Sequence, residues 1–171
     1  DDFPSIEANL MTKSGEKFTF FGVHPPPPSP TEEETSKERD GELLSVARKV
    51  VERTDPVIVV GDFNSVAWAK SSILFRKTSE LIDSRIGRGF VSTFHAKYKL
   101  LRFPIDLFFH SPSVFIKAFK TLRPIGSDHL PLYSEFYIKH FDNSQHEKVE
   151  QLEKEEIKEV DEMIDAGKNE D

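Results

Sequence analysis

The sequence contains no cysteine. Disulfide bonds, thiolate metal sites and cysteine nucleophiles are therefore excluded, and the redox state of the compartment is left undetermined. Long apolar runs are missing as well, since no stretch of about 18 consecutive apolar residues is present to span a membrane. The chain opens with two aspartates and not with the basic and apolar segments of a secretory signal. Any site must therefore use groups other than thiols.

Apolar residues are plentiful by contrast. Of the 171 residues, 37% are hydrophobic and 15 are Phe, which suffices for the core of one domain.

Charge is distributed unevenly along the chain, whose net charge is −7. The segment 142–171 contains 12 acidic and 4 basic residues, whereas the segment 63–141 contains 12 Lys or Arg and 5 Asp or Glu. A mildly basic body with a few placed carboxylates suits an anionic substrate that is handled through a metal ion. The alternative is that these Lys and Arg side chains only solvate the surface.

Strand and helix patterns alternate, which predicts an α/β fold. The segments Ser5–Met11 and Lys17–Val23 flank a Gly-containing turn and predict a hairpin. A capping box at Thr31 begins a predicted helix that ends near Arg53, and a β-branched strand over 57–61 follows. This order predicts parallel pairing of 17–23 with 57–61. Further predicted elements are a helix over 69–81 and strands over 105–109, 114–122 and 130–138, of which the last closes the sheet.

Two segments stand apart from this alternation. The proline-rich run 25–30 predicts an extended loop that fixes the direction of His24, with an SH3-type ligand as the alternative. The segment 145–166 places its apolar residues on one face at helical spacing, with acidic residues over the remainder. We expect this amphipathic helix to pack on the body of the protein or on a partner helix.

Polar, titratable residues follow or interrupt apolar strands at four places: His24, Asp62 with Asn64, Asp106, and Asp128 with His129. The strand over 57–61 is the clearest case, because functional groups collect at the carboxyl ends of strands in α/β sheets. A carboxylate next to a buried strand also needs a cation, an imidazole or backbone donors to compensate the cost of its desolvation. Individually each place has another explanation, such as a polar turn or a loop histidine.

Three short motifs occur in order: Gly61-Asp62-Phe63-Asn64, Pro104-Ile105-Asp106 and Gly126-Ser127-Asp128-His129-Leu130-Pro131. Preceded by His24, they resemble the C-terminal motifs of the endonuclease/exonuclease/phosphatase superfamily, which has the DNase-I-like fold. The resemblance covers residues 2–138 and is closest to the bacterial membrane-associated branch. That branch shows a His-Pro-rich loop, a Trp soon after the Asn (here Trp68) and an Arg-x-Pro-Ile-Asp-like segment (here 102–106).

The resemblance implies an α/β fold that is the C-terminal half of a DNase-I-like α/β sandwich, with one mixed sheet, flanking helices and a C-terminal amphipathic helix. Residues 1–141 would form the partial family domain and residues 142–171 the acidic helical tail. The implied activity is metal-assisted hydrolysis of phosphodiesters by a nuclease or related phosphatase, with Mg²⁺ or Mn²⁺ as cofactor. His129 would contact the scissile phosphate or aid proton transfer, oriented by Asp106.

The remaining implied roles concern the metal ion, the water and the phosphate oxygens. Asp128 and Asp62 would hold the metal ion, and Asp62 would also orient or deprotonate the attacking water. Asn64 and His24 would donate hydrogen bonds to phosphate oxygens.

The family also has an N-terminal half, which supplies an early Asn and the Glu that is a principal metal ligand. No segment of this sequence matches that half. We therefore expect a soluble fragment of a longer, membrane-anchored parent, with weak Mg²⁺ binding, weak or no hydrolysis and an undetermined compartment. A sheet face left uncovered should lead to self-association.

A second hypothesis is a non-catalytic interaction module that keeps the fold and binds a partner through its acidic helix. Retention of all six polar site residues together favours the hydrolase. The substrate stays open among DNA, RNA, lipid and small phosphoesters, although the basic residues between 70 and 120 favour a polyanion.

Overall fold

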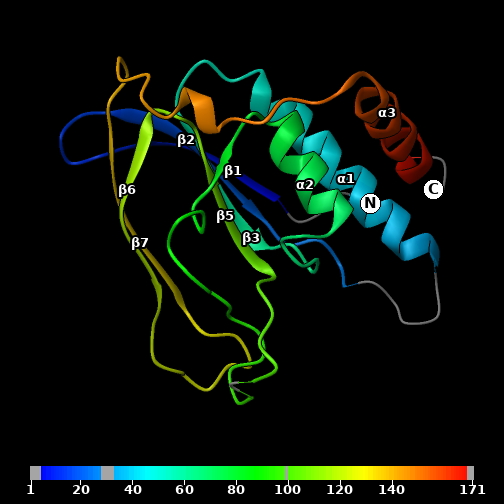
Figure 1. Ribbon diagram of the computed structural model, residues 1–171, viewed down its shortest axis with the longest axis horizontal. Coiled ribbons are helices and arrows are strands. Elements are labelled where there is room, and N and C mark those ends of the chain that lie inside the picture. Colours follow the sequence, from blue (N-terminus) through cyan, green and yellow to red (C-terminus); the bar gives the residue numbers. More distant parts are fainter. Residues whose placement is uncertain (1–4, 28–32, 99, 169–171) are drawn as a thin grey trace.

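The computed structural model describes residues 5–27, 33–98 and 100–168. Its centre is a mixed five-stranded sheet in the order β1-β2-β3-β5-β4 (Figure 1). The strands are β1 (Ser5–Met11), β2 (Lys17–Val23), β3 (Val57–Asp62), β5 (Asp106–His110) and β4 (Ile82–Asp83). The predicted hairpin of β1 and β2 and the parallel pairing of β2 with β3 are confirmed. The short strand β4 has no counterpart in the sequence prediction.

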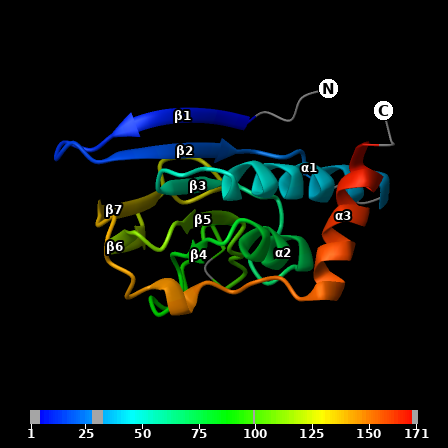
Figure 2. The same cartoon turned by 90° about the horizontal axis from the view of Figure 1, so that it is seen from above.

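Helix α1 (Glu33–Val51) makes the crossover between β2 and β3 and covers one face of the sheet together with α2 (Lys70–Thr78) (Figure 2). The predicted cap at Thr31 and part of the proline run lie outside the described residues. Between helices and sheet lies a core of aliphatic and Phe side chains, with members such as Leu43, Val59 and Phe109 that are at most 1% exposed.

Helix α2 ends before the predicted residue 81 because its C-terminus closes in a capping turn. Glu80 has a left-handed backbone with φ of 54°. The Glu80 amide donates to the Lys77 carbonyl and the Leu81 amide donates to the Arg76 carbonyl. This pair of bonds is the Schellman motif, which satisfies the last carbonyls of the helix and turns the chain. The chain is thereby directed into β4.

The prediction that 114–122 and 130–138 belong to the same sheet is wrong. The strands β6 (Val114–Thr121) and β7 (Leu132–Ile138) form a separate antiparallel two-stranded sheet. It packs on the face of the five-stranded sheet opposite to α1 and α2, where Ile116 and Phe119 meet Ile58 and Phe108. We expected this face to be uncovered, but it is buried at these positions. The structure therefore gives no support to self-association through it.

The tail is helical over a shorter range than 145–166. A short 3₁₀ turn (His146–Lys148) comes first, and α3 runs over Lys154–Lys168. Gln145 holds the preceding loop, because its buried amide donates to the carbonyls of Pro112 and Val114 at 2.9 and 3.0 Å. Tertiary hydrogen bonds therefore override the helical pattern at this end.

Helix α3 packs against α1 and α2 of the same chain (Figure 2). Val160 is fully buried against Leu44 and Leu74, and Gly41 and Gly167 let the backbones of α1 and α3 approach closely. Acidic residues of the tail pair with basic residues of the two helices: Asp161 with Arg48, Glu159 with Lys70, Glu150 with Arg76 and Glu156 with Lys77. The uneven charge of the sequence is thus partly neutralised within the molecule.

Among the helices of the described segments, none is long and apolar enough to cross a membrane.

Candidate phosphoester site

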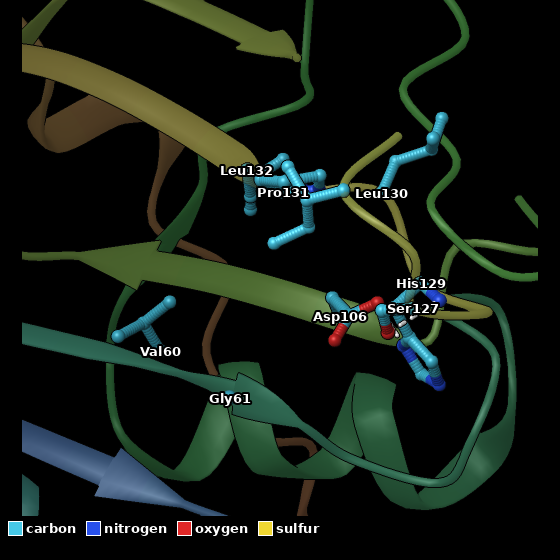
Figure 3. Close-up of a pocket in the computed structure, with 9 residues that line it drawn as sticks. Val60, Gly61, Asp106, Ser127, His129, Leu130, Pro131 and Leu132 are labelled. Carbon is cyan, nitrogen blue, oxygen red and sulfur yellow. Dashed lines mark hydrogen bonds and ion pairs between the residues drawn. The ribbon is translucent and has the colours of Figure 1, made fainter. Parts of the chain in front are cut away.

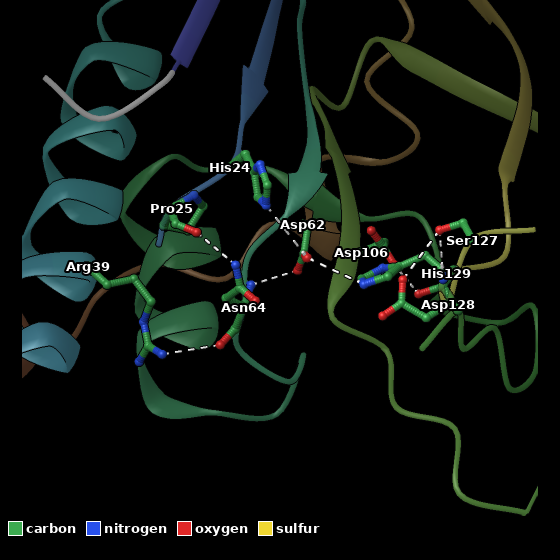
Figure 4. A network of polar contacts seen from close by, with 10 residues as sticks. His24, Pro25, Arg39, Asp62, Asn64, Asp106, Ser127, Asp128 and His129 are labelled. Atoms are coloured by element: carbon green, nitrogen blue, oxygen red, sulfur yellow. Dashed lines mark hydrogen bonds and ion pairs between the residues drawn. The ribbon is translucent and has the colours of Figure 1, made fainter. Parts of the chain in front are cut away.

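Strand pairing brings three of the four predicted polar positions to one edge of the sheet. His24 directly follows β2 and Asp62 ends β3, and these parallel strands finish side by side because Val23 pairs with Gly61. A Cβ on Gly61 would lie only 1.7 Å from the Val23 carbonyl oxygen, so glycine is required for this approach. Asp106 begins β5, which runs antiparallel to β3 and pairs Asp106 with Asp62 (Figure 4).

His129 reaches the same edge from the loop after β6. Phe94 forms an antiparallel bridge with His129, and the Leu130 amide donates to the Thr93 carbonyl at 3.0 Å. The His129 Nδ1 atom lies 2.8 Å from Asp106 Oδ2, and its Nε2 atom lies 3.7 Å from Asp62 Oδ2 (Figure 4). Because Asp106 is an acceptor, Nδ1 carries a proton, and Nε2 is the ring nitrogen that faces Asp62.

The electrostatics of this group favour a charged imidazole next to a partly desolvated carboxyl. Burial lowers the pKa of His129, but the hydrogen bond with Asp106 and the charges of Asp106, Asp62 and Asp128 outweigh it, so the pKa lies above 6.5. Burial raises the pKa of Asp62 above 3.8, although the Asn64 amide and the imidazoles of His129 and His24 act against it. Groups tuned in this way are typical of acid–base sites.

The turn after β3 is fixed by its own polar groups. Asp62 Oδ1 accepts a hydrogen bond from the Asn64 amide at 2.8 Å, and Asn64 has a left-handed backbone with φ of 47°. The Asn64 side chain donates to the Pro25 carbonyl at 2.7 Å, which ties this turn to the loop that carries His24. Asp62 Oδ2 is thereby left facing the two imidazoles, with His24 Nε2 4.0 Å away.

Two carboxylates and one imidazole form a candidate metal group. One ligand atom each from Asp62, Asp106 and His129 lies within 4.8 Å of the others. The oxygens of Asp62 and Asp106 suit a hard cation such as Mg²⁺, which takes near-octahedral oxygen ligands. His129 Nδ1 is hydrogen-bonded to Asp106, so Nε2 is the imidazole nitrogen left for a metal ion. Asp128, a predicted ligand, is exposed and lies outside the group, with Ser127 Oγ 3.5 Å from its carboxylate.

A sequence model of the Endonuclease/Exonuclease/phosphatase family matches residues 2–129. The chain belongs to this family. The membership agrees with the order of the motifs around Asp62, Asp106 and His129. The comparison with curated proteins finds no match.

Solved structures of family type share the fold. The mannosyl-6-phosphatase Bt3783 of Bacteroides thetaiotaomicron has a TM-score of 0.61 and 23% identity, covering 78% of this chain and 57% of its own. The human Nocturnin catalytic domain with bound sulfate has a TM-score of 0.59 and 22% identity, covering 79 and 53%. D. rerio TDP2 complexed with a single-strand DNA product has a TM-score of 0.60 and 21% identity, covering 78 and 61%. This family chain therefore spans little more than half the length of these relatives.

The structure adds two residues that the sequence reasoning missed. The Thr93 hydroxyl donates to the same Asp106 oxygen that contacts His129, and Thr93 is 1% exposed. Arg39 of α1, which is 8% exposed, donates from Nη1 to the Asn64 carbonyl at 3.1 Å. Both contact predicted site residues, Asp106 and Asn64, that are distant in the sequence, and neither lies in a recognisable motif.

A cavity of about 280 Å³ opens beside Asp106 and His129 (Figure 3). Its walls are mainly apolar and include Ile125, Leu130 and Leu132. The candidate site thus adjoins space for an apolar group.

Proposed function

We propose that this chain supplies the C-terminal portion of the site in a metal-dependent phosphoesterase that cleaves phosphodiesters. The observation that carries the proposal is the continuous contact of Asp62, His129 and Asp106 at one sheet edge. A carboxylate–imidazole–carboxylate series gives a base, a proton donor and an orienting acceptor within reach of one reacting phosphorus. The similar structures support both a nuclease substrate and a phosphatase substrate for the proposal. One of them is described as a mannosyl-6-phosphatase, and another is complexed with a DNA product.

In the proposed reaction, Asp62 accepts the proton of the attacking water, since its Oδ2 atom faces the imidazoles of His24 and His129 and not a backbone donor. His129 donates from Nε2 to a phosphate oxygen or to the leaving group. Asp106, with the Thr93 hydroxyl on the same oxygen, holds the imidazole in the required tautomer. His24 donates to a further phosphate oxygen, as does Asn64 through the second hydrogen of its Nδ2 group, the first being bonded to the Pro25 carbonyl.

A divalent cation, Mg²⁺ or Mn²⁺, would neutralise charge on the phosphate when bound. We propose Asp62 and Asp128 as its ligands from this chain, with Asp106, which lies in the same candidate metal group as Asp62, as a further carboxylate. These residues provide fewer ligands than an octahedral cation takes. Waters and phosphate oxygens fill part of such a set. We propose that a further protein ligand comes from outside this chain, so that the isolated chain binds metal weakly and turns over poorly.

The finer placement in the bacterial membrane-associated branch, through Trp68 and residues 102–106, belongs to the same proposal. So does the division into a partial family domain over 1–141 and an acidic tail over 142–171. An interaction module that binds a partner through the acidic helix is disfavoured, because α3 already uses its apolar face and several acids on α1 and α2.

The test is Mn²⁺ binding by isothermal titration calorimetry, combined with hydrolysis of bis(p-nitrophenyl) phosphate and of DNA. We expect binding that is weakened by Asp62→Asn and unchanged by the matched variant Asp142→Asn, whose half-buried side chain bonds to the Ser144 amide and Lys139. Hydrolysis should be barely detectable in the chain alone and abolished by His129→Gln. Strong turnover by the isolated chain would contradict the incomplete ligand set, and Mn²⁺ binding that Asp62→Asn leaves unchanged would contradict the site.

A further inference from the structure

Two loops at one end of the molecule expose large apolar side chains. The loop between β4 and β5 carries Tyr98, Leu100 and Leu101, which are 59, 99 and 63% exposed. The loop between β6 and β7 carries Ile125, which is 77% exposed. Figure 1 shows both loops at its lower end, away from α3. We call these four residues the apolar tip; gathered apolar side chains of this size mark a contact surface.

The apolar tip is fixed to the phosphoester site by backbone pairing. Phe94 forms antiparallel bridges with Phe103 and with His129, so the strand-like stem of the first loop lies against the site histidine. The Ala96 amide donates to the Asp128 carbonyl at 2.6 Å. A surface that binds the apolar tip would therefore lie at a fixed distance from the site.

Two exposed cations flank the apolar tip, and its first loop contains no Asp or Glu, whereas the second loop carries the exposed Asp128. Residues 84–105 contain five Lys or Arg and no Asp or Glu. Lys97 beside Tyr98, and Arg123 beside the second loop's Ile125, are both exposed. Apolar side chains flanked by cations complement an anionic lipid surface, where the cations meet headgroups and the apolar groups enter the acyl boundary.

The side-chain types favour a bilayer over a nucleic acid or a second copy of the chain. Nucleic-acid surfaces use aromatic rings on which bases stack, whereas three of the four tip residues are Leu or Ile. Two copies meeting tip to tip would bring like charges together. The cavity beside Asp106 and His129 is also lined by Ile125, so one residue of the tip borders the space next to the site.

We propose that the apolar tip inserts shallowly into an anionic phospholipid bilayer and presents lipid phosphoesters to the Asp62–Asp106–His129 site. The bilayer contact stands on the tip alone, while the lipid substrate rests on the proposed function.

The experiment is co-sedimentation of the full chain with phosphatidylcholine vesicles that contain or lack phosphatidylserine, in EDTA. We expect binding to the anionic vesicles, reduced at least about tenfold by the double change Leu100→Glu and Leu101→Glu. The matched control is Ile6→Glu with Met11→Glu, on β1, whose side chains are 66 and 65% exposed. Lys97→Glu should weaken binding to anionic vesicles, whereas Lys13→Glu, in the β1–β2 turn, should not. Unchanged urea midpoints show that all variants fold.

Equal binding of the Leu100/Leu101 variant and its control, or no binding to anionic vesicles by the unmodified chain, overturns the proposal. The proposal is also overturned if no vesicle binding is found and the Leu100/Leu101 variant instead loses binding to an oligonucleotide or loses self-association. Because the assay involves neither metal nor turnover, these results leave the phosphoesterase proposal standing. Failure of that proposal would instead appear as unchanged Mn²⁺ binding in Asp62→Asn with normal vesicle binding.

Discussion

At the scale of single residues, the contact between His129 and Asp106 controls the protonation of the His129 imidazole. The 2.8 Å hydrogen bond and the charge of Asp106 oppose burial and are major reasons why the pKa of His129 is raised. Thr93 donates to the same carboxylate oxygen and so restricts its rotation. The tautomer and the direction of Nε2 both follow from these contacts.

We predict that Asp106→Asn lowers the pKa of His129, measured by NMR titration of the imidazole in metal-free protein. Thr93→Val should change the pKa less, because the carboxylate remains, and Asp142→Asn should leave it unchanged. The contact of His129 with Asp106 stabilises the fold most below pH 6.5, where the imidazole of His129 is charged in both the folded and the unfolded chain. This contribution to stability is lost as the pH rises through the raised pKa of His129 in the folded chain. An unchanged His129 pKa in Asp106→Asn would refute the contact.

At the scale of the element, another histidine, His110, is the last residue of β5. It is 1% exposed, and its Nδ1 atom lies 2.9 Å from the Ser111 carbonyl, to which a neutral ring can donate. Burial lowers its pKa from 6.5 to about 4, although the Ser111 bond acts against burial. The end of the strand is therefore built around a neutral imidazole.

We predict that stability falls as the pH drops from 6.5 to about 4, because the unfolded chain binds the proton first. The loss is about 3 kcal/mol, at ~1.4 kcal/mol for each pKa unit. Urea unfolding at several pH values measures it. His110→Gln should flatten this part of the profile, whereas His146→Gln, on the 3₁₀ turn, should keep the slope. A profile that does not change in His110→Gln would refute a buried neutral ring.

The elements show how far sequence reasoning reaches. β1 and β2 match their predicted bounds, because their apolar patterns and turn are local signals. The separate sheet of β6 and β7 was not predictable in this way, since an alternating pattern identifies a strand but not its partner. The site shows the same division: Asp62, Asp106 and His129 meet as the motifs indicate, whereas Thr93 and Arg39 act through contacts that only the folded chain creates.

At the scale of the whole molecule, α3 is attached to α1 and α2 by apolar packing around Val160 and by a set of ion pairs. Val160 is fully buried, while Ile157 on the same helix is 42% exposed. The exposed pair of Arg48 with Asp161 contributes only about 0–1 kcal/mol, so we expect apolar packing to dominate the attachment.

We predict that Val160→Ala lowers the free energy of unfolding by about 1–3 kcal/mol, and that the matched change Ile157→Ala lowers it by less than about 1 kcal/mol. Urea denaturation followed by circular dichroism measures both values. Equal losses would show that α3 does not pack on α1 and α2 as described.

The most direct test of the site as a unit is diffraction from crystals soaked in Mn²⁺ and phosphate. We expect an anomalous peak against the Asp62 carboxylate, a phosphate oxygen next to His129 Nε2, and Asp106 still bonded to Nδ1. An anomalous peak only elsewhere, or His129 turned away from both carboxylates, would contradict the account.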